Sequence, residues 1–236
     1  MRSIQVRSLA AVASLAVTGV VTSSAHAGFP ALNVQWSLDG FTVFNDLPTG
    51  TPNGMGGFRY FGGHSVGPVS MSFSLVGIPE SRISGNFTLQ NFSLATVEVE
   101  LLVTLPITPA VSAPSSLTGS VAVGMTADAD GGTLAALDGI PFWQALIDGT
   151  LLGGGTDLLS DLLLDRPGLG SLESSGGFVQ LPGPEVLTEI GILVTFSLTA
   201  GEQMSFTSVF NVVPAPGGLV VLVLATMVIR RRRRAC

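Results

Sequence analysis

Alternation of apolar and polar side chains is the feature that most constrains how this 236-residue chain can fold. Over residues 97–105 nearly every second side chain is Val or Leu, and Glu98 and Glu100 lie between them. Further segments with a period of two are 70–75, 87–89, 190–198 and 204–210. A period of two places successive side chains on opposite faces of a strand. These segments therefore predict strands with one buried face.

Clusters of Gly, Pro, Asn and Ser separate the alternating segments, as in 47–54. Such clusters are typical of turns and loops. Two further strands are expected near 34–44 and 117–125. About seven to nine strands joined by turns predict an all-β body, an antiparallel β-sandwich of immunoglobulin-like or jelly-roll type.

One region departs from the period of two. Residues 156–165 read TDLLSDLLLD, with four leucines at helical spacing. Thr156 can cap a helix, and Pro167 with Gly168 can end it. We expect a short helical insertion here and a second helical turn within 139–149.

The first residues have the order of an export signal. Two arginines precede an apolar run over residues 9–21, and the small residues Ala25 and Ala27 follow it. This order predicts a signal peptide over residues 1–27, cut by signal peptidase before Gly28. A retained signal anchor is the alternative, but an apolar core of about 13 residues is short for a membrane span.

The last residues, 214–236, form a second tripartite signal after a body of residues 28–213. Its motif consists of Val213, Pro214, Ala215, Pro216 and Gly217. An apolar, uncharged segment over residues 217–229 follows, which as a helix covers about 20 Å of a hydrocarbon core of about 30 Å. The chain then carries Arg230, Arg231, Arg232, Arg233 and Arg234. Arginines on one side of an apolar helix keep that side in the cytoplasm, so the body is expected outside.

This tail resembles the PEP-CTERM sorting signal, which a membrane-embedded enzyme, exosortase, recognises. The resemblance covers only the tail and departs at Ala215, where the family's motif has Glu. It implies an apolar sorting helix, cleavage near the prolines, and delivery to the cell surface or extracellular matrix. A second interpretation takes Gly217 and Gly218 as a Gly-Gly tail for a rhomboid-type protease.

Composition excludes several function classes. Between residues 28 and 213 sixteen carboxylates face three arginines and no lysine, a net charge of −13 before histidine is counted. An acidic body repels the phosphate backbone, so no nucleic-acid partner is expected. The one cysteine is Cys236, so the body forms no disulfide, and a zinc site of histidines and thiolates lacks its ligands. We expect no cofactor.

One candidate metal site is visible. Asp128 and Asp130, followed by two glycines, resemble the opening of a calcium loop. The remaining ligands of such a loop are missing, and Asp138 would have to join from outside it. We therefore expect a solvated turn and no metal.

The remaining candidates are aromatic residues and one histidine. Trp36, Trp143 and Tyr60 can stack on sugars; alternation favours the core for Trp36, and Trp143 is the better candidate for exposure. His64 is the body's one histidine, and no nucleophile motif accompanies it. We expect a non-enzymatic surface or matrix protein. The alternative is a carbohydrate-binding module or carboxylate-dependent hydrolase acting on extracellular polysaccharide.

Overall fold

The alternating segments are strands in the computed structural model, which describes residues 30–215. The predicted all-β class is confirmed, and the strands form two antiparallel sheets. The eight-stranded sheet A contains β1 (Asn33–Leu38), β2 (Phe41–Asp46), β7 (Val97–Pro106), β9 (Gly132–Ala135), β10 (Trp143–Ile147), β11 (Thr150–Leu151), β12 (Leu163–Arg166) and β14 (Glu189–Leu198). The seven-stranded sheet B contains β3 (Thr51–Pro52), β4 (Phe58–Val66), β5 (Val69–Ile78), β6 (Arg82–Asn91), β8 (Ser115–Ala127), β13 (Gly170–Gly183) and β15 (Gln203–Pro214).

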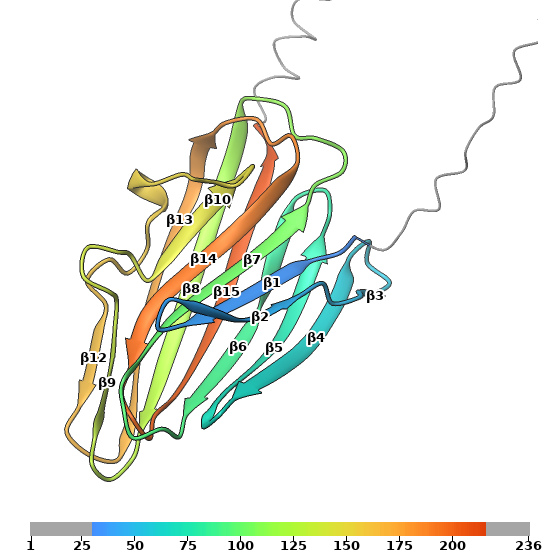
Figure 1. The fold of residues 1–236 in the computed structure, drawn as a ribbon. Coiled ribbons are helices and arrows are strands. Elements are labelled where there is room, and N and C mark those ends of the chain that lie inside the picture. The colour runs from blue at the N-terminus through green and yellow to red at the C-terminus, as the bar shows by residue number, and fades with distance from the viewer. Residues whose placement is uncertain (1–29, 216–236) are drawn as a thin grey trace, which may run out of the picture.

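Strands far apart in sequence are neighbours in both sheets (Figure 1). Sheet A has the order β11-β10-β14-β7-β1-β2, with β9 pairing with both β14 and β12. Sheet B has the order β13-β8-β15-β6-β5-β4-β3. The last strand, β15, thus lies inside its sheet and is paired on both edges, with β6 and with β8.

The alternation buries one face of each sheet against the other. In β8 and β15 the buried positions are every second residue along most of the strand. Aromatic side chains join the two buried faces: the ring centroids of Phe142 and Phe206 are 5.9 Å apart, and those of Trp143 and Phe210 are 6.0 Å apart. The buried apolar residues of both sheets form one cluster, so the sheets share a core.

Two of the two-residue hairpin turns consist of an Asp-Gly pair. Asp39 and Gly40 join β1 to β2 with φ of 49° and 80°, and Asp148 and Gly149 join β10 to β11 with φ of 50° and 73°. Two successive left-handed residues give the turn whose twist matches paired antiparallel strands, and Asp-Gly is a preferred pair for it.

The predicted helix over 156–165 is wrong. A 3-10 helix covers only Gly154–Thr156, and β12 begins at Leu163. Leu162 and Leu164 are buried while Leu163 is 64 % exposed, which is the period of a strand. Leu159 has a φ of 57°, which a continuous α-helix does not allow. Pairing with other segments has overridden local helical propensity.

The helical turn expected within 139–149 is also wrong, because this region contains β10. All five residues of β10 are buried, so the strand shows no alternation. A short strand buried on both faces cannot be distinguished from a helical segment by periodicity. β10 pairs with β14 along its whole length, and this pairing fixes its conformation.

Within residues 30–215 no helix has the length and apolar character needed to span a membrane. Several predicted features lie outside the described residues: the signal peptide with Ala25 and Ala27, the motif residues Pro216 and Gly217, the apolar segment 217–229 and the arginines 230–234.

Candidate functional site

The outer face of sheet B is made of small, uncharged side chains. Of its five inner strands, β5, β8 and β15 contain no charged residue, β6 contains only Arg82 at its first position, and β4 contains Arg59. Side chains between the buried positions of these strands include Ser70, Ser72, Ser74, Ser84, Asn86, Thr88, Gln90, Ser120, Ala122, Gly124, Thr126, Gln203, Ser205 and Thr207. Glu173 of the edge strand β13 is the only carboxylate in the strands of sheet B.

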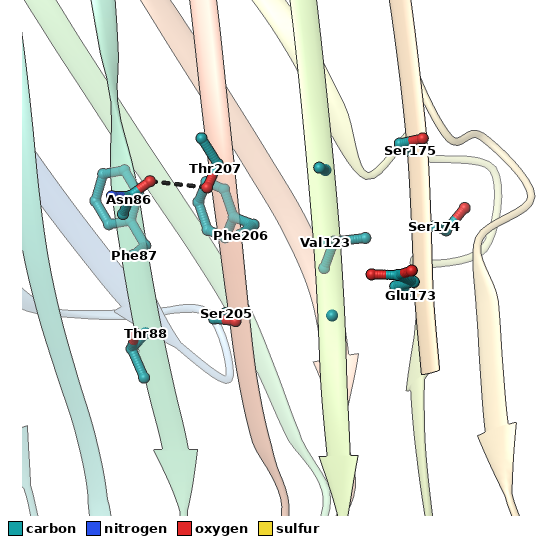
Figure 2. A pocket seen from close by; sticks show the side chains of 12 residues that line it. Asn86, Phe87, Thr88, Val123, Glu173, Ser174, Ser175, Ser205, Phe206 and Thr207 are labelled. Atoms are coloured by element: carbon teal, nitrogen blue, oxygen red, sulfur yellow. Dashed lines mark hydrogen bonds between the residues drawn. The ribbon is translucent and has the colours of Figure 1, made fainter. Parts of the chain in front are cut away.

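A groove of about 730 Å³ runs across this face (Figure 2). The register lines up one row across four strands, Glu173 of β13, Gly124 of β8, Ser205 of β15 and Thr88 of β6. The neighbouring row is Ser175, Ala122, Thr207 and Asn86. An adjoining hollow of about 550 Å³ shares Gly124, Glu173 and Ser205 with the groove and extends it toward Ser171 and Thr126.

The groove exists because β8 carries its smallest outward side chains here. Gly124 has none and Ala122 has one methyl group, so the floor lies close to the backbone. Phe87, Val123 and Phe206 also border the groove, but their side chains are buried in the core. Serine, threonine and asparagine side chains of the flanking strands rise on either side of the floor.

Hydrogen-bonding groups line the groove. The Thr207 hydroxyl donates to Asn86 Oδ1 at 2.7 Å, which fixes the amide so that its nitrogen is free to donate outward (Figure 2). Nearby on the same face, Gln90 Nε2 donates to Gln203 Oε1 at 2.9 Å. Hydroxyl and amide groups that both donate and accept suit a ligand rich in hydroxyl groups.

The lining supports binding better than catalysis. Glu173 is the only ionisable side chain among the groove residues, which include no His, Cys, Lys or Arg. Glycoside hydrolysis uses two carboxylates on either side of the scissile bond. Among residues 30–215 no three His, Cys, Asp or Glu side chains are grouped closely enough to hold a metal ion.

None of the aromatic candidates lies on this groove. Trp36 is fully buried, as predicted. The expectation for Trp143 is wrong: its side chain is also fully buried, and Nε1 donates to the Ser208 hydroxyl at 2.6 Å. Tyr60 is fully buried, its hydroxyl donates to the Pro30 carbonyl at 2.8 Å, and burial raises its pKa to about 12. These three side chains build core, so a stacking platform for sugars is absent from these positions.

His64 lies in β4 and is half-buried, not in a surface loop. Its ring packs against Phe44 with centroids 5.0 Å apart, and against Trp36 at 6.2 Å in an edge-on arrangement. Both partners belong to sheet A, so His64 closes one side of the core.

Asp128 and Asp130 lie in the turn after β8, and both are exposed. The Asp130 N–H donates to Asp128 Oδ1 at 2.9 Å, as in a turn stabilised by its own aspartate. Asp138 is exposed in the loop after β9 and does not join them in a metal-binding group. Sequence reasoning missed Glu202, which lies beside this turn and is 1 % exposed.

Asp148 organises the opposite end of the molecule. Its carboxylate accepts hydrogen bonds from the N–H groups of Leu187, Thr188 and Glu189 and from the Thr188 hydroxyl, at 2.7–3.2 Å. Burial by itself raises the pKa of Asp148, but these four donors together lower it to about 2.

The start of the predicted sorting motif belongs to the fold. Val213 and Pro214 are the last residues of β15 and pair with Ser116 and Ser115. The Ala215 N–H donates to the Pro114 carbonyl at 3.0 Å. No linker therefore separates the motif from the sheet.

Comparisons with known proteins leave the chain without a family. No family model matches it. A search of curated proteins also finds no match.

Proposed function

We propose that this chain is an exported, non-enzymatic protein of the cell surface or extracellular matrix, sorted by its PEP-CTERM-like tail. Its body is a β-sandwich of immunoglobulin-like or jelly-roll type, an assignment supported by two antiparallel sheets that share one core. Signal peptidase removes residues 1–27, and an exosortase-type enzyme processes the tail. The membrane is a partner only through that tail.

The tail itself carries the proposal. Residues 213–217 read Val-Pro-Ala-Pro-Gly, and an uncharged apolar segment and five arginines follow. The apolar segment can hold the tail in a membrane, and the arginines after it keep that end in the cytoplasm before the chain is cut. The strands of sheet B carry two arginines, Arg59 and Arg82, and no lysine, which is fewer than the cluster of basic residues that binds anionic lipid.

Truncation tests the proposal. A stop codon after Ala215 keeps all of β15 and the Ala215–Pro114 hydrogen bond, so the shortened chain keeps the fold. We expect full-length protein in the envelope fraction of the native host, and the truncated protein in the soluble periplasmic or secreted fraction with an unchanged melting temperature.

Replacing arginines 230–234 with Ser is the matched variant, since it keeps the length of the tail and removes its charge. We expect this variant to be misoriented or released. If the chain ending at Ala215 fractionates with the envelope as the full-length protein does, the body carries its own attachment and the proposal fails.

Carbohydrate binding is the second candidate function, and the sheet B groove favours it. The groove is open, nearly uncharged, and lined by hydroxyl and amide groups from four strands. A neutral polysaccharide meets hydrogen-bonding groups there without charge repulsion from the acidic body. The groove holds one carboxylate, so nothing in it favours the hydrolase alternative.

Affinity electrophoresis in neutral polysaccharides tests this candidate. Ala122→Phe fills the floor of the groove, whereas Ser65→Phe places the same side chain on the exposed face of β4, which β5 separates from the groove-lining strand β6. We expect retardation of the wild-type protein and of Ser65→Phe, and its loss in Ala122→Phe. Equal retardation of both variants would place any binding elsewhere.

A further inference from the structure

Glu202 is a buried carboxylate without a compensating partner. It is 1 % exposed, and neither of its oxygens has a hydrogen-bond partner within the described part of the chain. A buried carboxylate that lacks both hydrogen bonds and an opposite charge is strongly unfavourable. Either a proton on the carboxyl group or a cation from outside residues 30–215 must therefore compensate this group.

The fold holds Glu202 in this position. It precedes β15 in the turn from β14, and the buried Asn91 clamps that turn through two backbone hydrogen bonds: Asn91 N–H to the Glu202 carbonyl at 2.8 Å, and Gly201 N–H to the Asn91 carbonyl at 2.7 Å. The Asn91 amide also donates to the carbonyls of Leu198 and Thr199. The carboxylate cannot leave its site by a simple movement of the turn.

A missing side chain makes room for the carboxylate. Gly132 begins β9, and a Cβ atom on it would overlap the carboxyl group of Glu202. Glu202 thus lies directly against the loop that contains Asp128 and Asp130. Only glycine fits at position 132 with Glu202 in this place, because a Cβ atom would displace the acid.

Asp128 is the second carboxylate at this site. The register of β8 and β15 pairs Thr126 with Gln203, which brings Asp128 beside the turn that contains Glu202. Asp128 Oδ1 accepts the hydrogen bond from the Asp130 N–H. Asp128 Oδ2 lies close to Gly201, where a Cβ atom built on that glycine would be 2.5 Å from it. The hydrogen bond that the Asp128 carboxylate accepts within residues 30–215 goes to Oδ1, so Oδ2 is available to a ligand.

Glu202 has no cationic partner within residues 30–215, because neither of its carboxylate oxygens accepts a hydrogen bond from an arginine there. Arg166 pairs with Gly132 across β9 and β12, but its guanidinium turns toward the Leu169 carbonyl, 3.5 Å away.

We propose that Glu202 and Asp128 bind a calcium ion in the turn between β8 and β9. Calcium accepts six to eight oxygen ligands in irregular geometry, so two carboxylates can be completed by main-chain oxygens and water. Magnesium demands near-ideal octahedral geometry and suits such a site less well. Asp130 contributes its backbone N–H to orient Asp128, and its own carboxylate is not a ligand. The site is independent of the tail and of the sheet B groove.

Calcium titration of the full-length chain, purified in detergent and stripped with EGTA, tests the proposal. We expect calorimetry to detect one site per chain, and millimolar calcium to raise the melting temperature by several degrees because the ion binds only the folded state. The same concentration of magnesium should have a much smaller effect. An unchanged melting temperature and no binding heat, or an equal response to magnesium, would overturn the proposal.

Variants locate the ion. Glu202→Gln removes the buried charge and should abolish the calcium response. Asp128→Asn changes an exposed side chain, which keeps the test valid if Glu202→Gln does not fold, and should weaken calcium binding at least tenfold. Asp138→Asn removes an equal charge from an exposed loop outside the site and should bind calcium as the wild-type protein does. A calcium response that survives in Asp128→Asn would refute the site.

Discussion

The hydrogen bond between Trp143 and Ser208 offers the sharpest test of the shared core. Trp143 belongs to β10 of sheet A and Ser208 to β15 of sheet B, and their side chains are 0 % and 1 % exposed. Nε1 donates to the hydroxyl at 2.6 Å. The bond therefore joins the two sheets in a region without water, where an unpaired polar group is costly.

Trp143→Phe should be clearly destabilising. It leaves the Ser208 hydroxyl unpaired, which costs about 1–3 kcal/mol. It also removes one ring of a closely packed indole, which adds about 1–2 kcal/mol. For a domain of this size each kcal/mol lowers the melting temperature by about 2–4 °C, so we expect a fall of about 5–15 °C.

A double-mutant cycle isolates the hydrogen bond. Ser208→Ala alone leaves the indole N–H unpaired and should cost about 1–3 kcal/mol. In the Trp143→Phe background the same change removes a hydroxyl that is already unpaired, so it should be close to neutral. The predicted coupling energy, about 1–2 kcal/mol, can be measured by urea denaturation of all four proteins. Additivity within about 0.5 kcal/mol would refute a direct bond between the sheets.

Three further changes test local features, each by denaturation of purified protein. Asp148→Ala should cost about 1–2 kcal/mol at pH 7; since the folded pKa, about 2, lies below the unfolded value of 3.8, this cost should shrink as the pH falls below about 4. Asn91→Ala leaves the carbonyls of the buried Leu198 and the half-buried Thr199 without their side-chain donor and should cost about 2 kcal/mol or more. Gly62→Ala would overlap the Phe73 ring and should cost about 1–3 kcal/mol, whereas Gly124→Ala meets only an ordinary contact at 3.6 Å and should be nearly neutral.

Opposite outcomes would be informative in each case. A cost of Asp148→Ala that stays constant between pH 7 and pH 2.5 would show that the carboxylate is not held ionised by its donors. A neutral Asn91→Ala would mean that water replaces the amide. Equal costs for the two glycine substitutions would mean that the Phe73 ring moves away freely.

Alternation in the sequence was sufficient to predict the strands that are buried on one face. The segments 97–105 and 190–198 became β7 and β14, and 204–210 became part of β15. In β15 the local pattern and the tertiary environment agree along most of the strand, because one face meets the core and the other is exposed or half-buried, whereas the second face of β14 is also buried or half-buried. The all-β class follows directly from that agreement.

Prediction failed where tertiary contacts decide the conformation. The leucines near 158–163 pair with segments before them: Leu158 exchanges backbone hydrogen bonds with Trp143, and the Leu162 carbonyl accepts from Ala136. Nothing in the local sequence encodes these partners. The burial of Trp143 has the same origin, because β10 lies under β13 and β15 and its indole meets Phe178 and Phe210.

Glu202 could not have been identified from its neighbours in sequence. Thr199 to Gln203 reads as a polar turn, in which a glutamate is ordinarily exposed. Its burial depends on Gly132, seventy residues earlier, which leaves the space that the carboxylate occupies. Two segments that look like unrelated turns thus form one site only after β8, β9 and β15 have assembled.

The position of β15 links the fold to the proposed sorting signal. β15 pairs with β6 on one edge and with β8 on the other, so sheet B is incomplete until β15 has joined it. The body therefore folds only when residues up to Pro214 are free to pair with these two strands. The first two motif residues are then held in the ladder, and Ala215 is bonded to Pro114. An enzyme that reads the motif in the folded protein consequently finds its first three residues, Val213 to Ala215, already held by hydrogen bonds of the body. If the proposed tail is processed, its cleavage therefore lies beyond Ala215, where cutting the backbone costs the folded body none of its hydrogen bonds.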